Sequence, residues 1–311
     1  MSQTKAIVNK LLTGVSKGYL PEGFIGDQIL TDKAVVMKSG LIGSHGKQHL
    51  RLMNTVYGGR GKAPRFESNT RSSTTYLIES HGLEGMVTQD DYDNVEDPFD
   101  AEKDETLFLT TVLKISREKA IADALGSTSV LTQNVTLSGT SQFNDYVNSN
   151  PLSRFEVAQA AVYDGCGVPP DSAIMSWKVF NKLSYHPAIL EALGFKENRA
   201  GTLNAAEVAS AMKVKRLLVG QPKYNSAALG QTDVLADIWG KNIVFAVLPR
   251  EAMKMQVSLG YQIRKIGQAP YETSKWDHDN PRGATGILTT DFYDDVLTDV
   301  GAAYLIKDAI A

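Results

Sequence analysis

The chain has 311 residues, of which 42% are hydrophobic and 22% are charged, and its formal net charge is −3. This length accommodates one large domain or two ordinary ones, and the small negative charge excludes a global basic field that would hold nucleic acid by electrostatics alone. The single cysteine, Cys166, excludes an internal disulfide, and no apolar run is long enough to span a bilayer. The first 20 residues lack the pattern of a secretory signal.

The first quarter of the chain is expected to form an arm followed by a long hairpin. Residues 6–20 favour a short helix that leads into an extended segment, and residues 24–39 are typical of a strand. Residues 37–80 are predicted to form a polar β-hairpin, with a strand over 48–57 and glycines at 58–61 that suit a turn. The tip has too few large apolar residues to bury itself, so we expect the hairpin to be exposed.

The charge of the hairpin contrasts with that of the segment after it. Residues 44–72 contain six cations and one acid, whereas residues 79–106 contain eleven acids and one cation. A basic arm and an acidic segment in one chain can pair between copies, and such head-to-tail contacts build rings when the rotation closes. The cations expected to contact a neighbouring copy are Lys47, Arg51, Arg60, Lys62 and Arg65. The candidate acidic partners are Asp90, Asp91, Asp93, Glu96 and Glu102.

A long helix is predicted to start inside the acidic segment. Asp97 followed by Pro98 is typical of a helix start, and Gly126 is a plausible stop. An approximate apolar stripe is formed by Leu109, Val112, Leu113, Ala120 and Ala124. At about 1.5 Å per residue such a helix spans roughly 42 Å, so we expect it to be a structural spine.

The remainder of the chain is predicted to contain a compact α/β module over 151–250 and a β-rich end. The helices expected in the module cover 151–165, 178–186, 187–195 and 203–213, and the strands cover 172–177, 214–220 and 242–248. A short strand is expected within 128–137. Strict alternation from Met253 to Ile263 is the clearest strand signal in the protein. A polar loop over 271–283 is expected to lead into a last strand region that starts at Ala284.

Phosphate and metal motifs fail on their spacing. Gly40 and Gly46 are separated by five residues rather than four, and Gln48 stands where a phosphate loop needs a hydroxyl for magnesium. His45 and His49 would share a face only on a helix, and the surrounding pattern favours strands. The sequence therefore predicts no cofactor and no metal site.

Catalytic motifs are also missing from the sequence. Cys166 lies between two glycines without a motif that supplies a histidine or stabilises a thiolate. No catalytic residue is predicted, and we expect the chain not to be an enzyme. Direct nucleic-acid binding by the hairpin over 44–72 stays open as an alternative, because Tyr57 and Phe66 flank the tip and could stack on bases.

The order of these segments resembles the major capsid proteins of tailed phages. The stretches that carry the resemblance are YLPEGFIGDQIL (19–30), TTYLIESHGLEG (74–85), DPFDAEKDETLFLTTVLKISREKAIADAL (97–125), HPAILEAL (186–193), LLVGQPKYNSAALGQTDVLADIWGKNIVFA (217–246) and DVGAAYLIKDAI (299–310). None of them is decisive alone. The match is specific because the series keeps its order and covers nearly the whole chain.

The resemblance implies an α+β fold of the Hong Kong 97 type. Residues 1–36 would be the N-terminal arm, and residues 37–90 would be the extended loop (E-loop) that lies over a neighbouring subunit. Residues 91–150 and 252–311 would form the peripheral domain around the long spine helix. Residues 151–251 would form the α/β axial domain, whose loops meet at the centres of pentamers and hexamers.

The resemblance also implies a function and partners. The chain would assemble with other copies into pentamers and hexamers of a closed icosahedral shell around double-stranded DNA, which it would hold without sequence specificity. Scaffolding and portal proteins would be further partners, a decoration protein is another candidate, and no membrane is involved. The protein would lie in the capsid of the virion after assembly in the cytoplasm of the bacterial host. An encapsulin-like bacterial nanocompartment with the same fold is the alternative.

Overall fold

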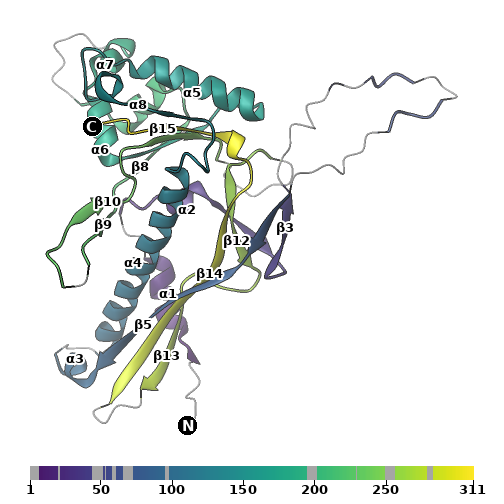
Figure 1. The fold of residues 1–311 in the computed structure, drawn as a ribbon. Helices are drawn as coiled ribbons and strands as arrows, with labels where there is room; N and C mark the ends of the chain where they lie inside the picture. Colours follow the sequence, from purple (N-terminus) through teal and green to yellow (C-terminus); the bar gives the residue numbers. More distant parts are fainter. Residues whose placement is uncertain are drawn as a thin grey trace.

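Two mixed sheets and one long helix organise the chain in the computed structural model (Figure 1). The structure describes residues 7–19, 22–43, 52, 54–57, 61–65, 73–94, 98–194, 202–228, 230–248, 256–278 and 283–311. Helix α4 (Pro98–Leu125) runs along the larger sheet toward the smaller one (Figure 1). Its bounds confirm the predicted spine helix and the predicted stop before Gly126.

The larger sheet has the strand order β1-β13-β14-β12-β2, and β5 pairs with the other edge of β14. Its strands are β1 (Ile7–Val8), β2 (Thr31–Val35), β5 (Glu79–Thr88), β12 (Gly260–Lys265), β13 (Glu272–His278) and β14 (Ala284–Leu297). Strand β14 is the common member: its first half pairs with β13 and its last four residues pair with β12. Helices α1 (Lys10–Gly18) and α4 pack on this sheet.

The polar loop predicted over 271–283 is wrong, because residues Glu272–His278 form strand β13 between β1 and β14. Partners on helix α1 and strand β14 bond the buried threonine of this strand. The Thr273 hydroxyl is buried, 3.0 Å from the Ser16 hydroxyl and 3.3 Å from that of Thr289. Polarity alone therefore misled the sequence-based prediction.

The smaller sheet has the order β6-β15-β11-β7-β8. Its strands are β6 (Asn134–Thr136), β7 (Ser172–Ser176), β8 (Arg216–Gly220), β11 (Ile243–Ala246) and β15 (Ala303–Lys307). The helices that follow the predicted module are α5 (Pro151–Cys166), α6 (Trp177–Ser184), α7 (Pro187–Ala192) and α8 (Ala205–Ala211). Phe143, Phe155 and Phe245 are fully buried in the core beneath them. The predicted α/β elements of this region are confirmed, with boundary shifts of a few residues.

Two short hairpins lie outside both sheets. Strands β3 (Ser39–Gly43) and β4 (Ser73–Leu77) pair antiparallel and confirm the base of the predicted long hairpin. The strand predicted over 48–57 is not found at its described residues, 52 and 54–57. Strands β9 (Lys223–Asn225) and β10 (Leu235–Asp237) form the second hairpin.

Two short helices and one strand differ from expectation in the first hundred residues. The strand predicted over 24–39 is interrupted, because helix α2 (Gly26–Ile29) precedes β2. Helix α3 (Gln89–Asp93) links β5 to the spine region and begins with a capping box from Thr88.

The predicted strand signal from 253 onward is found as β12, where Tyr261 to Arg264 are buried on both faces of the sheet. Residues 249–255 lie outside the described part.

Candidate functional site

The buried face of helix α4 carries charged side chains as well as apolar ones. Leu109, Leu113 and Ile121 are buried at intervals of four residues or multiples of four, and Arg117 occupies the position between the last two. Lys114 and Glu118 are buried beside this row. The predicted apolar stripe is wrong in part, because Val112 and Ala120 face outward. Periodicity alone could have placed Arg117 in the core row, since it is four residues from both Leu113 and Ile121.

Glu118 fastens the start of helix α2 to the spine helix. Its Oε1 accepts hydrogen bonds from the Ile25 amide at 3.0 Å and from the Trp239 indole at 2.7 Å. Its Oε2 accepts from the Gly26 amide at 2.7 Å. Burial raises the pKa of the Glu118 carboxyl, and these hydrogen bonds oppose that rise. A carboxylate here satisfies helix-start donors that would otherwise be orphaned.

Arg117 links the same short helix to the larger sheet. Its guanidinium bonds Asp27 of α2 and Asp295 of β14, the latter at 3.2 Å, and lies 5.3 Å from the centre of the Tyr293 ring. Burial by itself lowers the pKa of Arg117, but Asp295 and Asp27 raise it overall, so the group stays charged. Burial raises the pKa of Asp295, against the opposing effect of Arg117.

A second arginine stacks on the same ring. Arg264 of β12 forms a two-pronged pair with Asp291 of β14, with Nη2 to Oδ2 at 2.9 Å, and both side chains are almost fully buried. Its guanidinium lies 5.7 Å from the Tyr293 ring centre, and its Nε lies 3.5 Å from a carboxylate oxygen of Asp32 on β2. The two parallel hydrogen bonds of this ion pair hold strands β12 and β14 in a fixed register.

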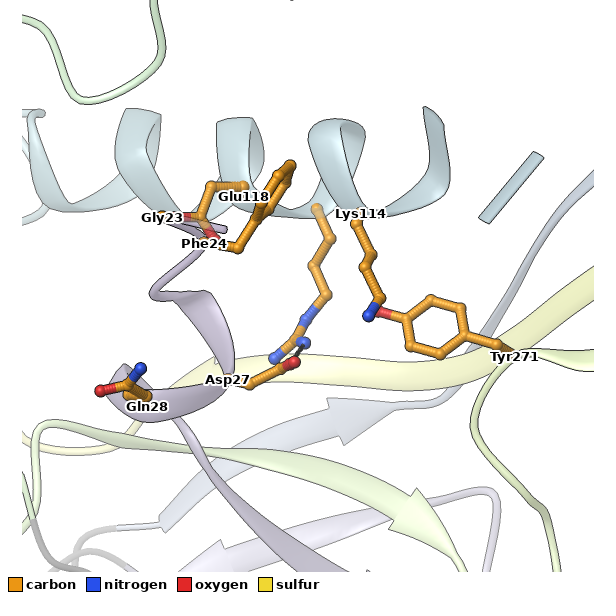
Figure 2. Close-up of a pocket in the computed structure, with 8 residues that line it drawn as sticks. Gly23, Phe24, Asp27, Gln28, Lys114, Glu118 and Tyr271 are labelled. Carbon is orange, nitrogen blue, oxygen red and sulfur yellow. Dashed lines mark hydrogen bonds and ion pairs between the residues drawn. The ribbon is translucent and has the colours of Figure 1, made fainter. Parts of the chain in front are cut away.

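A cavity of about 410 Å³ lies between the spine helix and the arm segment (Figure 2). Its lining residues are Gly23, Phe24, Asp27, Gln28, Lys114, Arg117, Glu118 and Tyr271. The Lys114 ammonium bonds the Tyr19 carbonyl and lies 5.0 Å from the Tyr271 ring centre. Burial lowers the pKa of Lys114 and raises that of Tyr271 to about 12. Because the charged groups of this lining bond one another or the backbone, the arrangement suits a structural junction.

Only part of the predicted basic surface lies in the described residues. Lys62 and Arg65 are exposed. Lys47, Arg51 and Arg60 lie outside the described residues, as do His45 and His49. The two described cations are therefore available to solvent or to a partner, and they lie in the segment of the chain between β3 and β4.

The candidate acids occupy different environments. Asp90 and Asp93 are exposed on α3. Asp91 is exposed too, but it accepts hydrogen bonds from the Thr88 amide and hydroxyl, which lower its pKa. Glu102 is 8% exposed and is engaged inside its own subunit, where it bonds Lys275 and accepts from the Tyr92 hydroxyl at 2.9 Å. Glu96 lies outside the described residues.

In the described part of the chain, the structure gives little support to a reactive cysteine, a metal site or a membrane-spanning helix. Cys166 is buried, and its sulfur lies 3.2 Å from the carbonyl oxygens of Val162 and Val168. Across the described residues, no group of three or more histidine, cysteine and acidic side chains could hold a metal ion. A search of the same residues finds no helix with the length and apolarity to cross a membrane.

Two curated phage proteins are similar to the chain along most of its length. The major capsid protein of Burkholderia phage BcepMu is 27% identical over 310 residues, which cover 97% of this chain and 96% of the relative. The major capsid protein of Pseudomonas phage JBD67 is 25% identical over 255 residues, covering 81% of each chain. No protein-family model matches the sequence.

Solved structures share the fold over nearly the whole chain. A phage-related protein from Bordetella bronchiseptica RB50 superposes with a TM-score of 0.75 at 21% identity, covering 98% of both chains. The mature capsid protein of bacteriophage PhiM1 superposes with a TM-score of 0.54 at 13% identity, covering 99% of this chain and 91% of that one. Segment order, fold and similarity agree: the chain has the Hong Kong 97-type α+β fold and is similar over most of its length to the major capsid proteins of two phages.

Proposed function

We propose that copies of this chain assemble into pentamers and hexamers of an icosahedral shell that encloses double-stranded phage DNA. The observation that carries the proposal is similarity to a phage major capsid protein over 97% of the chain, together with a capsid fold over the same length. A shell-forming role is structural, and it places the protein in the virion capsid. The finer parts of the proposal are the capsomer types, the enclosed DNA, assembly in the host cytoplasm, and scaffolding, portal or decoration partners.

The two sheets support a division into functional regions. We assign residues 1–36 to the N-terminal arm, 37–90 to the extended loop, 91–150 with 252–311 to the peripheral domain, and 151–251 to the axial domain. Strands β6 and β15 fall within the peripheral ranges but hydrogen-bond into the axial sheet. In this division β6 and β15 join the two domains, because the chain passes from the larger sheet to the smaller sheet at each of these strands.

The extended loop is proposed to clasp a neighbouring copy through its cations. Lys62 and Arg65 are exposed, and among the candidate acids Asp90 and Asp93 are exposed on α3 without an ion pair within the described residues. Glu102 is removed from the set of acceptors, since Lys275 of its own subunit neutralises it. Surface pairs of this kind contribute little each, so specificity would come from several acting together.

Charge reversal tests this clasp. We expect Lys62→Glu with Arg65→Glu to reduce shell yield, and Asp90→Lys with Asp93→Lys in the same chain to restore it. The matched control reverses the exposed Lys241 and Lys265 and leaves the yield unchanged. The yield is measured by sedimentation of the purified protein. Unchanged yield in the loop variant would remove the cations from the contact, without affecting the proposal that shells form.

The enclosed material is tested on particles from the native source. Nuclease treatment of intact particles followed by extraction should release genome-length double-stranded DNA. Particles that instead hold one abundant cargo protein and no protected DNA would support a nanocompartment. Binding of free DNA by unassembled subunits, lost with the loop variant, would support the nucleic-acid alternative.

A further inference from the structure

A second cavity, of about 490 Å³, adjoins the cavity between the spine helix and the arm segment. The two cavities have Asp27, Gln28, Lys114 and Tyr271 in common among their lining residues. The charged groups that line the second cavity are the cations Lys17, Lys114, Arg216 and Arg264 and the acids Asp27 and Asp32. An excess of cations around a hollow favours the entry of an anion.

The two arginines of this lining are already neutralised inside the subunit. Arg264 forms its two-pronged pair with the buried Asp291. Arg216 Nη2 lies 3.3 Å from a carboxylate oxygen of Asp171 and also bonds the Leu248 carbonyl. Neither guanidinium therefore needs a further countercharge.

The two acids of the lining are paired as well. Asp27 bonds Arg117, and Asp32 lies 3.5 Å from Arg264 Nε. The side chains of Asp27 and Asp32 are 54% and 65% exposed. Because these carboxylates are both paired and open to solvent, their repulsion of an entering anion is screened.

The two lysines, in contrast, form no ion pair with the described residues. Lys114 is 6% exposed, and its ammonium bonds the Tyr19 carbonyl and lies 5.0 Å from the centre of the Tyr271 ring (Figure 2). Lys17 is exposed in the last turn of α1. A buried ammonium without a countercharge is costly, and the burial lowers the pKa of Lys114. An anion in this cavity would supply the missing charge.

Gln262 adds a buried amide that lacks an acceptor. Alternation along β12 places Tyr261 and Ile263 in an apolar core, whereas Gln262 and Arg264 lie on the opposite face and line the cavity. Gln262 is 2% exposed, and its Nε2 has no hydrogen-bond partner among the described residues. Buried donors in native proteins nearly always have an acceptor, so this amide also points to a ligand with oxygen atoms.

We propose that the cavity binds a small oxyanion such as inorganic phosphate between the ammonium groups of Lys114 and Lys17 and the Gln262 amide. An oxyanion supplies both a negative charge for the lysines and an acceptor for the amide, whereas water supplies only the acceptor. The ion is small because Lys114 and Gln262 are buried and are reached through the cavity. It would connect α1, α4 and β12 within one subunit, so the site does not depend on the proposed shell function.

Thermal unfolding of unassembled subunits tests the site. Sodium phosphate should raise the melting temperature above the value in sodium chloride of the same pH and ionic strength, because a ligand of the folded state stabilises it. Gln262→Leu should abolish this rise. In chloride its melting temperature should equal or exceed that of the wild type, since an unpartnered amide is replaced by an apolar group of similar size. Equal melting temperatures of the wild type in the two salts would overturn the proposal.

Titration calorimetry with phosphate locates the ion. Lys17→Met should weaken phosphate binding about tenfold, because one charge-assisted contact is lost. The control Lys241→Met removes an exposed lysine outside the lining and should bind phosphate like the wild type. Phosphate binding that is unchanged in both Gln262→Leu and Lys17→Met would show that the ion lies elsewhere and would overturn the assignment.

Discussion

At the scale of single residues, buried charges rather than catalytic groups define the centre of the molecule. Glu118, Arg117 and Arg264 each bond partners from segments far apart in the sequence. Burying a charge is costly unless it is paired, and each of these groups has opposite charges or amide donors around it. A plain apolar core at these positions would lack the directionality of these bonds. We infer that these groups fix where the arm and strands sit on the spine.

The Glu118 contacts predict a graded loss of stability. Glu118→Ala leaves the Ile25 and Gly26 amides and the Trp239 indole without their acceptor, and should lower the free energy of unfolding by about 3 kcal/mol. Glu118→Gln should cost less, because one oxygen can still accept. Urea unfolding of unassembled subunits measures both, with the exposed Asp104→Asn as control. Equal stability of the alanine variant and the wild type would contradict the role of Glu118.

His186 predicts a dependence of stability on pH. Its Nδ1 accepts from the Ala188 amide at 3.2 Å and its Nε2 bonds the Ser149 hydroxyl at 2.9 Å, with Tyr146 packed edge-on. Burial lowers the pKa of His186 below its ordinary value of 6.5. The unfolded chain therefore binds the proton first, and this contribution to stability is lost as pH falls through that region.

The matched variant for this effect is His186→Asn, which keeps a helix-capping side chain but does not titrate there. Unfolding measured from neutral to mildly acidic pH should show a smaller loss of stability in the variant than in the wild type. The comparison cancels the raised pKa values of Glu118 and Asp295, which act with the opposite sign. Identical pH profiles would rule out His186 as the source.

At the scale of elements, the sequence predicts what local signals determine and misses what tertiary contacts decide. The bounds of α4 follow from Pro98 and Gly126 at its two ends, and they are confirmed. Strand β13 is polar, and it forms a strand because it pairs with β1 and β14. Helix α2 starts where Glu118 accepts a hydrogen bond from the Gly26 amide, 92 residues away in the sequence. Single-sequence patterns contain no information on such long-range partners.

The candidate contact surfaces also divide into features that the sequence predicts and features that only the fold reveals. The basic hairpin is visible as a charge pattern, whereas the engagement of Glu102 by Lys275 depends on residues 173 positions apart. The exposure of Leu41 and Leu77 on the β3–β4 hairpin becomes visible only when the fold is known.

The close packing of strand β8 against Trp239 allows a test by substitution at Gly220. A Cβ on Gly220 of β8 would lie 2.1 Å from Trp239 Cδ1, so the indole would have to leave its position beside Glu118. Gly220→Ala should therefore destabilise the subunit by about 1–3 kcal/mol. Gly14→Ala is the control, since nothing lies within 4 Å and a helical alanine should stabilise by about 0.5–1 kcal/mol. Thermal unfolding that shows no difference in sign between the two would contradict this packing.

At the scale of the whole molecule, the chain combines a body of two sheets with two hairpins on opposite sides (Figure 1). The spine helix and the larger sheet are held by buried ion pairs, and the smaller sheet has a separate apolar core. The β3–β4 and β9–β10 hairpins leave apolar and charged groups exposed. Under the proposed function, contacts with other copies would bury such groups in subunit interfaces.

The most direct test of this account is cryo-electron microscopy of the purified protein under assembly conditions. We predict closed icosahedral shells in which each subunit fits the fold described here, with five-fold and six-fold clusters of subunits. Protein that stays monomeric under every assembly condition, in the absence of shells in the native source, would contradict the central claim.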